Sequence, residues 1–470
     1  MQKSRELIEL EIESLAGTGE GVGRHSGAAV FVSFTAPGDR ILADVGPVGQ
    51  GRRRGRLVRV VEAGPHRVKP PCNLFGLCGG CAWLCCSYES QVEAKSNHAR
   101  RAFRVAGGGD PSLRDVEVTV ERAKNIYGYR RKARLHWEKS ADGVAIGFMN
   151  RGGCRIVDLG DGGSCVVLRS AILGVVGSLR EVIGLSGAPA AGEVSVLVGA
   201  QNRIHLAFFP CSRRSAKRRG KRAGGRFTGA ARNKCEELVS SGLVVGMVFA
   251  ERKCFSRLGE DSVFLEEGPA KSISPDSEVV SESAIKGSAA CFVQANAEMN
   301  ERIRKTVRGI DVLGPVLELY AGIGNFTMDF LSSERVTAAE IDETACKLLK
   351  RNAARAGCGS RIRVLNEDAS SVVDSLISDG ELSMDGTPGL VLVDPPRAGC
   401  GKLIRSLAGL GSSKILYISC DAMTCARDVA RLMEGGYRIM DIRGYDTMPH
   451  TAHFELVVLM EKKSTRDAPE

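Results

Sequence analysis

The sequence predicts a multidomain protein with a small N-terminal β-barrel, a central α+β region and a C-terminal α/β domain. Residues 1–62 alternate short apolar runs with glycine-rich turns, which is typical of short strands. A cysteine-rich segment opens the central stretch, 63–285, and residues 286–470 change to a repeat of strand, turn and helix. The length of 470 residues also exceeds one ordinary core and agrees with about three domains.

The composition excludes several classes of protein. Hydrophobic residues make up 43% of the chain and charged residues 26%, which is typical of a globular rather than a disordered protein. No stretch reaches the roughly 18–20 uninterrupted apolar residues that a membrane helix needs. The first ten residues are charged and lack the apolar core of a secretory signal. We therefore expect a cytoplasmic protein without membrane contact.

The net charge of +10 is distributed unevenly along the chain. Five arginines lie in residues 52–59, and ten lysines and arginines lie in residues 211–234. Blocks of this kind favour a polyanionic partner such as nucleic acid, whereas the alternative is a solvated loop that only aids solubility. Residues 211–234 lack apolar periodicity, so we predict a loop-forming basic insertion there.

The predicted N-terminal barrel rests on strand periodicity. Leu7 to Glu13 alternates apolar and acidic residues, as a half-buried strand does, and a glycine-rich turn follows. Further strands are predicted at 28–34, 41–45 and 56–62. A basic all-β module of this size resembles an OB-type nucleic-acid binder, although a generic small β-domain is the alternative.

The remaining elements follow from apolar periodicity and turn residues. In the central region we predict a helix over 91–105, strands at 130–137, 144–149, 194–198 and 203–209, and a polar linker over 265–287. In the last domain we predict strands at 316–319, 336–341, 361–365, 390–393, 415–419, 437–445 and 456–460, with helices over 326–331 and 344–356. This alternation indicates a Rossmann-like domain with a mostly parallel sheet.

The 16 cysteines indicate metal-binding or catalytic thiols rather than disulfides, because the chain is long and lacks a secretory signal. Cys72, Cys78 and Cys81 supply three soft thiolates around the flexible pair Gly79-Gly80. A fourth ligand must come from elsewhere. The nearest candidates are Cys85 and Cys86, and a zinc site with the spacing Cys81-x3-Cys85 is the competing interpretation.

Three patterns in the last domain indicate a nucleotide-like cofactor. Gly322 and Gly324 form a turn between a strand and a helix, where the backbone can approach a ligand closely. Glu340 lies at the end of the second strand, where a carboxylate can hold ribose hydroxyls. Asp394 closes a buried strand and precedes two prolines that stiffen its loop.

A candidate nucleophile follows a later strand of the same sheet. Cys420 lies at the strand tip, at the edge where the glycine turn and Asp394 also converge, and a thiolate there can attack a substrate. Glu455 precedes the last strand and is the candidate base, with a solvated carboxylate as the alternative.

Six motifs taken together resemble the RNA (uracil-5-)-methyltransferase family. They are Cys72-x5-Cys78-Gly-Gly-Cys81, Phe292-Val-Gln294-Ala-Asn296, Leu319-Tyr-Ala-Gly-Ile-Gly-Asn-Phe-Thr327, Val393-Asp-Pro-Pro-Arg-Ala-Gly399, Tyr417-Ile-Ser-Cys420 and Pro449-His-Thr-Ala-His-Phe-Glu455. They span nearly the whole chain in this order. The resemblance is to the branch with an N-terminal TRAM domain and a [4Fe–4S] cluster that modifies large-subunit (23S) ribosomal RNA.

The resemblance implies a TRAM-like RNA-binding barrel over 1–62, an iron–sulfur domain over 63–285 with the basic insertion 211–234, and a methyltransferase domain over 286–470. The residues that it assigns to S-adenosylmethionine binding are Gln294, Tyr320, Asn325, Glu340, Asp368 and Asp394. The cluster ligands that it implies are Cys72, Cys78, Cys81 and Cys165, with Cys154 as a reserve for the fourth. One departure is that Asp421-Ala422 follows the nucleophile where the family usually has Asn-Pro.

The resemblance further implies methylation of carbon 5 of a uridine through a covalent bond between Cys420 and carbon 6 of the base, with Glu455 as the base that removes the carbon-5 proton. The uridine must then be unstacked, by base flipping or in a single-stranded loop. Alternative functions are the same chemistry on transfer RNA and a non-catalytic iron–sulfur RNA-binding protein, which Cys420 disfavours. We expect RNA as the partner, no obligate protein partner and a monomer.

Overall fold

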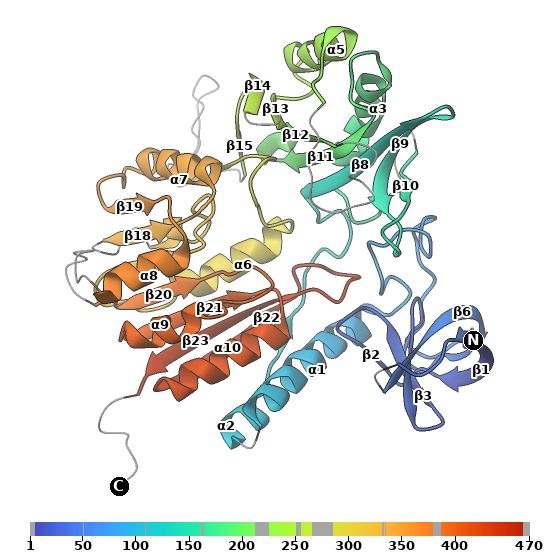
Figure 1. Ribbon diagram of the computed structural model, residues 1–470, viewed down its shortest axis with the longest axis horizontal. Helices are drawn as coiled ribbons and strands as arrows, with labels where there is room; N and C mark the ends of the chain where they lie inside the picture. The colour runs from blue at the N-terminus through green and yellow to red at the C-terminus, as the bar shows by residue number, and fades with distance from the viewer. Residues whose placement is uncertain are drawn as a thin grey trace.

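The computed structural model describes residues 5–49, 51–108, 110–160, 164–211, 225–250, 255–265, 285–330, 333, 335–378 and 387–463. This part of the chain forms three large sheets (Figure 1), and each of them packs on an apolar core. The strands β15 (Val263–Phe264) and β16 (Lys286–Gly287) pair with each other in a separate two-stranded sheet. Among the described helices, none combines the length and the apolar character that crossing a membrane requires.

The N-terminal sheet has the order β1-β5-β6-β4-β3-β2. Its strands are β1 (Glu6–Glu11), β2 (Ser14–Leu15), β3 (Gly21–His25), β4 (Ala28–Val32), β5 (Arg40–Val45) and β6 (Arg52–Glu62). The two strands at the ends of this order are separated only by residues 12 and 13, so the sheet curls around its own core. β6 begins four residues before the predicted strand and therefore includes the whole arginine-rich stretch.

The central sheet has the order β10-β9-β8-β11-β12-β13-β14, and α3 and α5 share its core. Its elements are β8 (Lys132–Ser140), β9 (Gly143–Met149), β10 (Ile156–Asp158), α3 (Ser170–Gly184), β11 (Ala191–Val198), the 3-10 turn η1 (Ala200–Asn202), β12 (Ile204–Cys211), α5 (Gly229–Ser240), β13 (Gly246–Ala250) and β14 (Phe255–Gly259). The four strands predicted here are confirmed.

The predicted loop over 211–234 is wrong at its C-terminal end. Helix α5 begins at Gly229 and buries Ala231, Cys235 and Leu238 in the core of the central sheet. The helical spacing of these three apolar residues was obscured by the lysines and arginines around them. Most of the basic insertion, residues 212–224, lies outside the described residues.

The C-terminal sheet has the order β19-β18-β17-β20-β21-β23-β22-β7. Its elements after residue 288 are α6 (Ala297–Arg308), β17 (Val316–Leu319), the 3-10 turn η2 (Thr327–Asp329), β18 (Val336–Ala339), α7 (Glu343–Arg355), β19 (Ile362–Leu365), α8 (Ala369–Ser378), β20 (Leu390–Val393), α9 (Leu403–Gly409), β21 (Lys414–Ser419), α10 (Ala422–Glu434), β22 (Tyr437–Tyr445) and β23 (Glu455–Lys462). β17 to β21 run parallel and β23 is antiparallel to its neighbours, so the predicted mostly parallel sheet is confirmed.

Helices cover both faces of this sheet. Helices α6 and α7 contribute to the core on one face, and α1 (Tyr88–Gly107), α8, α9 and α10 contribute to the core on the other. The helix predicted over 326–331 is wrong, because the described residues there form only the turn η2. The Asp329 carboxylate in this turn faces Arg304 and Arg308 of α6.

A stretch from the predicted central region packs on the C-terminal sheet instead. Helix α1 lies against α10, and the one-turn helix α2 (Pro111–Arg114) follows it (Figure 1). Strand β7 (Val120–Glu121) then extends the sheet beside β22. The reason is that Val92, Ala99 and Phe103 form an apolar face on α1 that is buried in the core of that sheet.

Candidate active site

The carboxyl ends of the parallel strands meet at one edge of the C-terminal sheet. Leu319 is paired with Ala339 on one side and with Val393 on the other. The next residues along these three strands, Tyr320, Glu340 and Asp394, therefore follow neighbouring strand ends. In an open α/β sheet this is the edge at which ligands bind.

The glycine turn after β17 is held by the carboxylate of Glu340. The backbone N–H of Gly322 donates to Oε2 of Glu340 at 2.9 Å, and the N–H of Asp342 donates to Oε1 at 2.7 Å. Gly322 and Gly324 both have positive φ, and so does Tyr320 at +62°. Because such angles are costly for a residue with a Cβ, the turn requires glycine at two positions and strains Tyr320.

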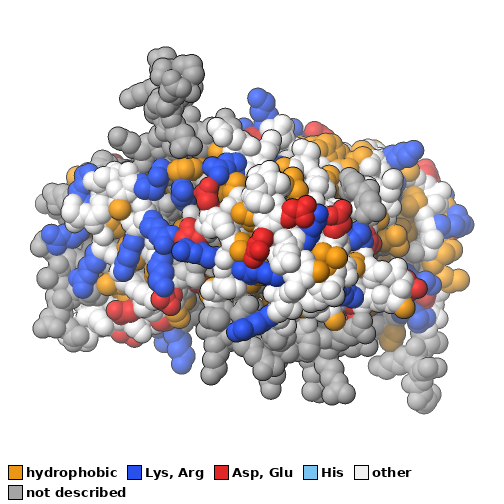
Figure 2. Space-filling view, turned by 90° about the horizontal axis from the view of Figure 1, so that it is seen from above, with side chains coloured by type: hydrophobic (Ala, Val, Ile, Leu, Met, Phe, Trp, Pro, Cys, Tyr) orange, Lys and Arg blue, Asp and Glu red, His pale blue; other side chains and the backbone are white. Residues whose placement is uncertain are grey.

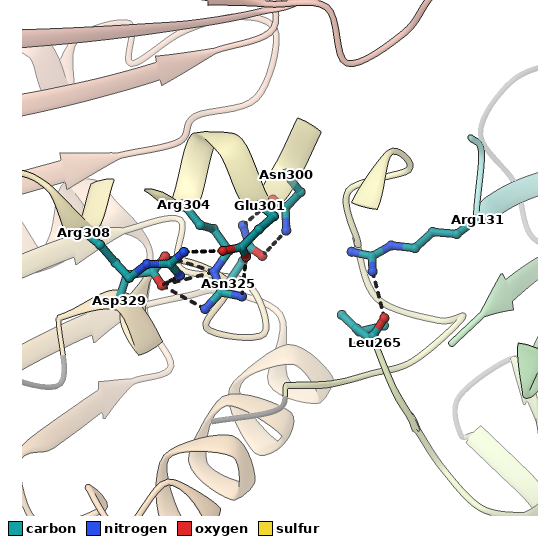
Figure 3. Close-up of polar contacts among 8 residues, drawn as sticks. All are labelled: Arg131, Leu265, Asn300, Glu301, Arg304, Arg308, Asn325 and Asp329. Atoms are coloured by element: carbon teal, nitrogen blue, oxygen red, sulfur yellow. Dashed lines mark hydrogen bonds and ion pairs between the residues drawn. The ribbon is translucent and has the colours of Figure 1, made fainter. Parts of the chain in front are cut away.

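Helix α6 is tied to the same turn by polar contacts (Figure 3). The side-chain amides of Asn300 on α6 and Asn325 in the turn exchange two hydrogen bonds, both of 2.9 Å. The buried carboxylate of Asp329 accepts from Arg304 and Arg308, which fixes the helix to η2. The turn and the helix therefore form one rigid unit at the edge of the sheet.

Gln294 lies just before α6, in the segment that leads into the helix. Its backbone carbonyl accepts from Nε of Arg131 at 3.0 Å. Figure 3 shows the second bond of the same guanidinium, which donates to the carbonyl of Leu265 at 3.1 Å. These bonds hold the backbone of Gln294 next to the central sheet, from which Arg131 comes.

Two carboxyl groups at this edge have a raised pKa. Burial raises the pKa of Glu318 to about 8, and the negative charges of Asp329 and Asp394 add to the effect. Burial also raises the pKa of Asp394 to about 7. The edge is therefore a poorly hydrated site in which negative charge is disfavoured until a positive group arrives.

Asp368 lies at the start of α8, where its carboxylate accepts from the N–H of Ser370 at 2.9 Å. Its charge contributes to raising the pKa of Tyr320 to about 12, after burial as the main cause and the neighbouring Cys400 thiol. Asp368 is therefore close enough to Tyr320 to act on it electrostatically.

Cys420 and Glu455 lie side by side at the other half of the edge. Ser419 of β21 pairs with Leu456 of β23 in antiparallel register, so Cys420 comes next to Glu455 at the strand end. Burial raises the pKa of the Cys420 thiol to about 11, and Glu455 and Asp394 add to this while the Arg397 cation opposes it. The resting thiol is therefore protonated at neutral pH, whereas a thiolate is needed for attack.

The side chain of Glu455 is buried, and the residue is only 8% exposed. Burial raises the pKa of its carboxyl group well above the ordinary value, and the negative charge of Asp394 adds to the effect while Arg397 opposes it. A carboxyl group whose pKa is raised in this way is a better proton acceptor than a solvated one.

The residue after the candidate nucleophile departs from the usual family pattern and has a structural role here. Asp421 caps α10, because its side chain accepts from the N–H of Thr424 at 2.9 Å. Its own N–H donates to Oγ of Ser419 at 3.2 Å. The loop of Cys420 is thus held by a helix cap instead of by a proline.

The four predicted cluster cysteines line one cavity. Cys72, Cys78, Cys81 and Cys165 surround it together with apolar side chains and Arg130, whose guanidinium lies over the ring of Phe148. No group of three or more potential ligand side chains among the described residues is close enough to hold a single metal ion. An iron–sulfur cubane is bound by four cysteine thiolates, and the four thiols around this cavity are a donor set of that kind.

The alternative fourth ligands face elsewhere. Cys85 and Cys86 are buried against the N-terminal sheet, and Sγ of Cys86 lies 3.5 Å from the carbonyl of Thr35. Cys154 is exposed and contacts Asn150. None of these three thiols lines the cavity formed by the described residues.

Sequence reasoning missed three residues of the site. Arg397 acts electrostatically on both Cys420 and Glu455, and its place directly after two prolines was the available signal. Glu318 is a buried carboxyl group in β17, and Asn300 reaches the turn from α6. No motif in the sequence marks these last two residues, whose partners are Thr327 and Asn325.

Comparisons with known proteins find RNA methyltransferases. The profile of the tRNA (Uracil-5-)-methyltransferase family matches residues 280–463. A 23S rRNA (uracil(1939)-C(5))-methyltransferase of Chromohalobacter salexigens is 30% identical over 98% of this chain and 90% of its own length. The enzyme of the same description from Halomonas elongata is also 30% identical, over 96% of this chain and 89% of its own length.

A solved structure shares the fold over almost the entire chain. The Pyrococcus abyssi tRNA (uracil-54, C5)-methyltransferase, solved with S-adenosyl-L-homocysteine, superposes with a TM-score of 0.67 at 22% identity. The superposition covers 96% of this chain and 99% of that one. Together with the relatives at 30% identity, this shows that the chain belongs to the family of S-adenosylmethionine-dependent RNA (uracil-5-)-methyltransferases.

Proposed function

We propose that the protein methylates carbon 5 of a uridine in 23S ribosomal RNA through a covalent bond between Cys420 and the base. The observation that carries this proposal is the side-by-side placement of Cys420 and Glu455 at the edge that also holds the glycine turn and Asp394. A nucleophile, a proton acceptor and a cofactor turn at one edge are the parts that this reaction needs.

The chemistry follows from these residues. The Cys420 thiol releases its proton to water, and its sulfur then bonds to carbon 6 of uracil, which turns the ring into an enolate and makes carbon 5 nucleophilic. Carbon 5 then takes the methyl group, which S-adenosylmethionine supplies from its sulfonium. Glu455 removes the proton from carbon 5, the enolate re-forms, and its electrons expel the Cys420 thiolate.

The proposed cofactor contacts lie in the half of the sheet edge that is formed by the ends of β17, β18 and β20. The residues that we assign to S-adenosylmethionine are Gln294, Tyr320, Asn325, Glu340, Asp368 and Asp394. Support comes from the raised pKa of Asp394, because a group whose negative charge is disfavoured gains most from a neighbouring cation such as a sulfonium. Glu340 already organises the backbone of the glycine turn, and its position suits ribose hydroxyls.

Ribosomal RNA is favoured over transfer RNA by the relatives that match over nearly their full length. Transfer RNA is the second candidate, because the family profile and the Pyrococcus structure carry that description. The test is to map 5-methyluridine in both RNAs from a deletion strain. We expect a 5-methyluridine site to be lost from 23S ribosomal RNA and to be restored by the wild-type gene. We also expect the enzyme to act in the cytoplasm. Loss from transfer RNA alone would contradict the choice of substrate.

We further propose that Cys72, Cys78, Cys81 and Cys165 hold a [4Fe–4S] cluster with a structural role. Support comes from the single cavity that all four line and from Arg130, whose cation offsets the negative charge of such a cluster. Protein purified without oxygen is expected to be brown and to contain about four irons per chain. Cys165→Ser is expected to lose the iron, whereas Cys154→Ser serves as the control and keeps it. Colourless protein with one zinc ion would contradict the cluster.

We propose that the N-terminal sheet is a TRAM-like RNA-binding barrel. Arg52, Arg54, Arg56 and Arg59 are exposed on β6, but Arg53 points inward and bonds to Glu6 and the carbonyl of Gly46, so it is not an RNA contact. The face of the molecule that Figure 2 shows also carries lysines and arginines, but acidic side chains are mixed among them.

A salt titration tests the role of this sheet. Replacing Arg52, Arg54 and Arg59 by Gln is expected to flatten the dependence of RNA affinity on salt, by about one in the log–log slope for each phosphate that an arginine no longer neutralises. Arg438→Gln, which removes an exposed arginine from β22, is the matched control. An unchanged slope in the triple variant would show that these arginines are only solvated.

A further inference from the structure

One face of α1 contacts the loop that leads to the proposed base. Gln91, Lys95 and His98 have the spacing i, i+4 and i+7, so they lie on the same side of the helix. The loop over residues 446–454 joins β22 to Glu455, and in Figure 1 it extends from the sheet toward the N-terminal segments. All three side chains meet this loop.

Gln91 binds His450 through both ends of its amide. Its Oε1 accepts from the backbone N–H of His450 at 2.7 Å, and its Nε2 lies 3.2 Å from Nδ1 of the same residue. The Nε2 group also donates to the carbonyls of Cys86 at 2.9 Å and Trp83 at 3.2 Å. This orientation is fixed, because a flipped amide would set its oxygen against two carbonyl oxygens. The side chain is fully buried.

Lys95 forms a fully buried ion pair with Asp446, the first residue of the loop. Both side chains are 0% exposed, and Nζ lies 2.5 Å from Oδ1. The same ammonium donates to the carbonyl of Met448 at 3.2 Å. An ammonium without water around it must use such partners, so the loop cannot move away without leaving a buried charge.

The last contact of this helix face reaches the residue before Glu455. The ring of His98 packs edge-on against Phe454, with ring centroids 6.4 Å apart. Neighbouring segments add further contacts. The backbone N–H of Trp83 donates to the backbone carbonyl of His450 at 3.0 Å, and the ring of Tyr127 stacks on the ring of His450. The loop is therefore held along its length by residues that precede the C-terminal domain.

The hydrogen bonds within the loop fix its shape less than its contacts with α1 and the neighbouring segments do. Its internal hydrogen bonds centre on Thr451, whose hydroxyl donates to the carbonyl of Met448 at 2.8 Å. His450 has a φ of +66°, a conformation that a residue with a side chain keeps only when its surroundings hold it. These surroundings are Gln91, Trp83 and Tyr127.

We propose that this face of α1 positions the proton-accepting carboxylate, with Gln91 as the positioning residue that locks the loop before Glu455. The inference rests on the proposed covalent function. Because Glu455 is the first residue of β23, a shift of the loop turns its carboxylate away from carbon 5, while Cys420, which directly follows β21, stays in place. Loss of Gln91 therefore slows proton removal and not the formation of the covalent bond.

The test follows the adduct over time with in-vitro-transcribed 23S ribosomal RNA and radiolabelled S-adenosylmethionine. Gln91→Met has a similar shape and no hydrogen bonds, and Ser96→Ala is its matched control. Ser96 is buried on the same helix, but it bonds to the N–H of Val120 instead of to the loop. We expect Gln91→Met to form the denaturation-stable RNA–protein adduct at the wild-type rate and to release methylated RNA at least tenfold more slowly. Ser96→Ala should release it as the wild type does.

The outcomes separate the inference from the function on which it rests. Release of methylated RNA at the wild-type rate by Gln91→Met would overturn the positioning role. Slower adduct formation in both Gln91→Met and Ser96→Ala would overturn it as well, because it would indicate a general loosening of α1. Glu455→Gln is included as a reference. If this variant traps the adduct and Gln91→Met does not, only the inference fails. If neither the wild type nor Glu455→Gln yields any adduct, the covalent function fails and the inference with it.

Discussion

The two halves of the sheet edge are built in different ways. In the cofactor half, the bonds that shape the site join residues close in sequence, such as Gly322 with Glu340 and Asn300 with Asn325, 18 and 25 positions apart. In the catalytic half, the loop before Glu455 is held by Lys95 and Gln91 across 351 and 359 positions. Apart from Gln294, whose carbonyl accepts from Arg131, the cofactor half is shaped by contacts within the C-terminal domain, whereas the catalytic half needs the N-terminal part of the chain.

The largest effect is expected from removing the proposed nucleophile, which should affect only the catalytic half. Cys420→Ala is expected to lower methyl transfer by about 10⁴-fold or more, the scale on which enzymes lose a nucleophile. Binding of S-adenosylmethionine, measured by calorimetry, should be unchanged. The control is Cys425→Ala, because this nearby thiol is fully buried in α10. An active Cys420→Ala enzyme, or an inactive Cys425→Ala enzyme, would move the nucleophile to Cys425.

The second prediction concerns the stability of the long-range attachment. Lys95→Met leaves the Asp446 carboxylate buried without its partner and is expected to lower the free energy of unfolding by about 3–5 kcal/mol. Adding Asp446→Leu should restore most of the loss, because the charge is then gone. Urea unfolding of the three proteins measures both effects.

A local ion pair in the cofactor half provides the contrast. Lys347 and Glu343 on α7 lie one helical turn apart and are both exposed, at 65% and 71%. Lys347→Met is expected to leave the unfolding midpoint almost unchanged. A loss as large as that of Lys95→Met would remove the distinction between the two halves.

The third prediction tests the cofactor half directly. Glu340→Ala leaves the N–H groups of Gly322 and Asp342 without their acceptor, and such charged hydrogen bonds contribute about 1.5–3 kcal/mol. Affinity for S-adenosylmethionine is therefore expected to fall about 10- to 100-fold. Glu343→Gln, an exposed carboxylate nearby, is the control. RNA affinity should be the same in all three proteins, and a parallel loss of RNA binding would mean that the two halves are not independent.

The fourth prediction is a pH dependence of stability without ligand. Burial raises the pKa of Glu318 to about 8, so the folded protein holds a proton that the unfolded chain has released above about pH 4.3. The free energy of unfolding therefore falls as the pH rises from about 5 to 8, by up to about 1.4 kcal/mol per pH unit from this group. Glu318→Gln should flatten this fall. Identical slopes in urea titrations of the two proteins would show that Glu318 is charged in the folded state.

The sequence predicted those parts of the site that short patterns encode. Gly322 and Gly324 after a strand, Asp394 before two prolines, and Cys420 at a strand tip each carry a local signal, and the parallel sheet brings them to one edge. A mostly parallel sheet was predicted, but its strand order was not, because β17 lies beside β20 and β23 lies between β21 and β22.

The features that were not predicted depend on contacts between distant segments. Gln91 looks like any polar residue of an amphipathic helix, and only the fold shows that it lies on the buried side. Arg53 was grouped with its exposed neighbours, but strand alternation turns it inward. Helix α1 and strand β7 precede the central sheet in the chain yet pack on the C-terminal one, which no local pattern encodes.

The most direct test of the account is to locate the covalent bond in the Glu455→Gln protein. Without the proton acceptor, the methylated base should stay attached, so a stable RNA–protein adduct is expected in the presence of S-adenosylmethionine. After digestion, mass spectrometry should find 5-methyluridine bound to the peptide that contains Cys420. Attachment at Cys425, or an adduct without the methyl group, would contradict the assignment of Cys420 as nucleophile and Glu455 as base.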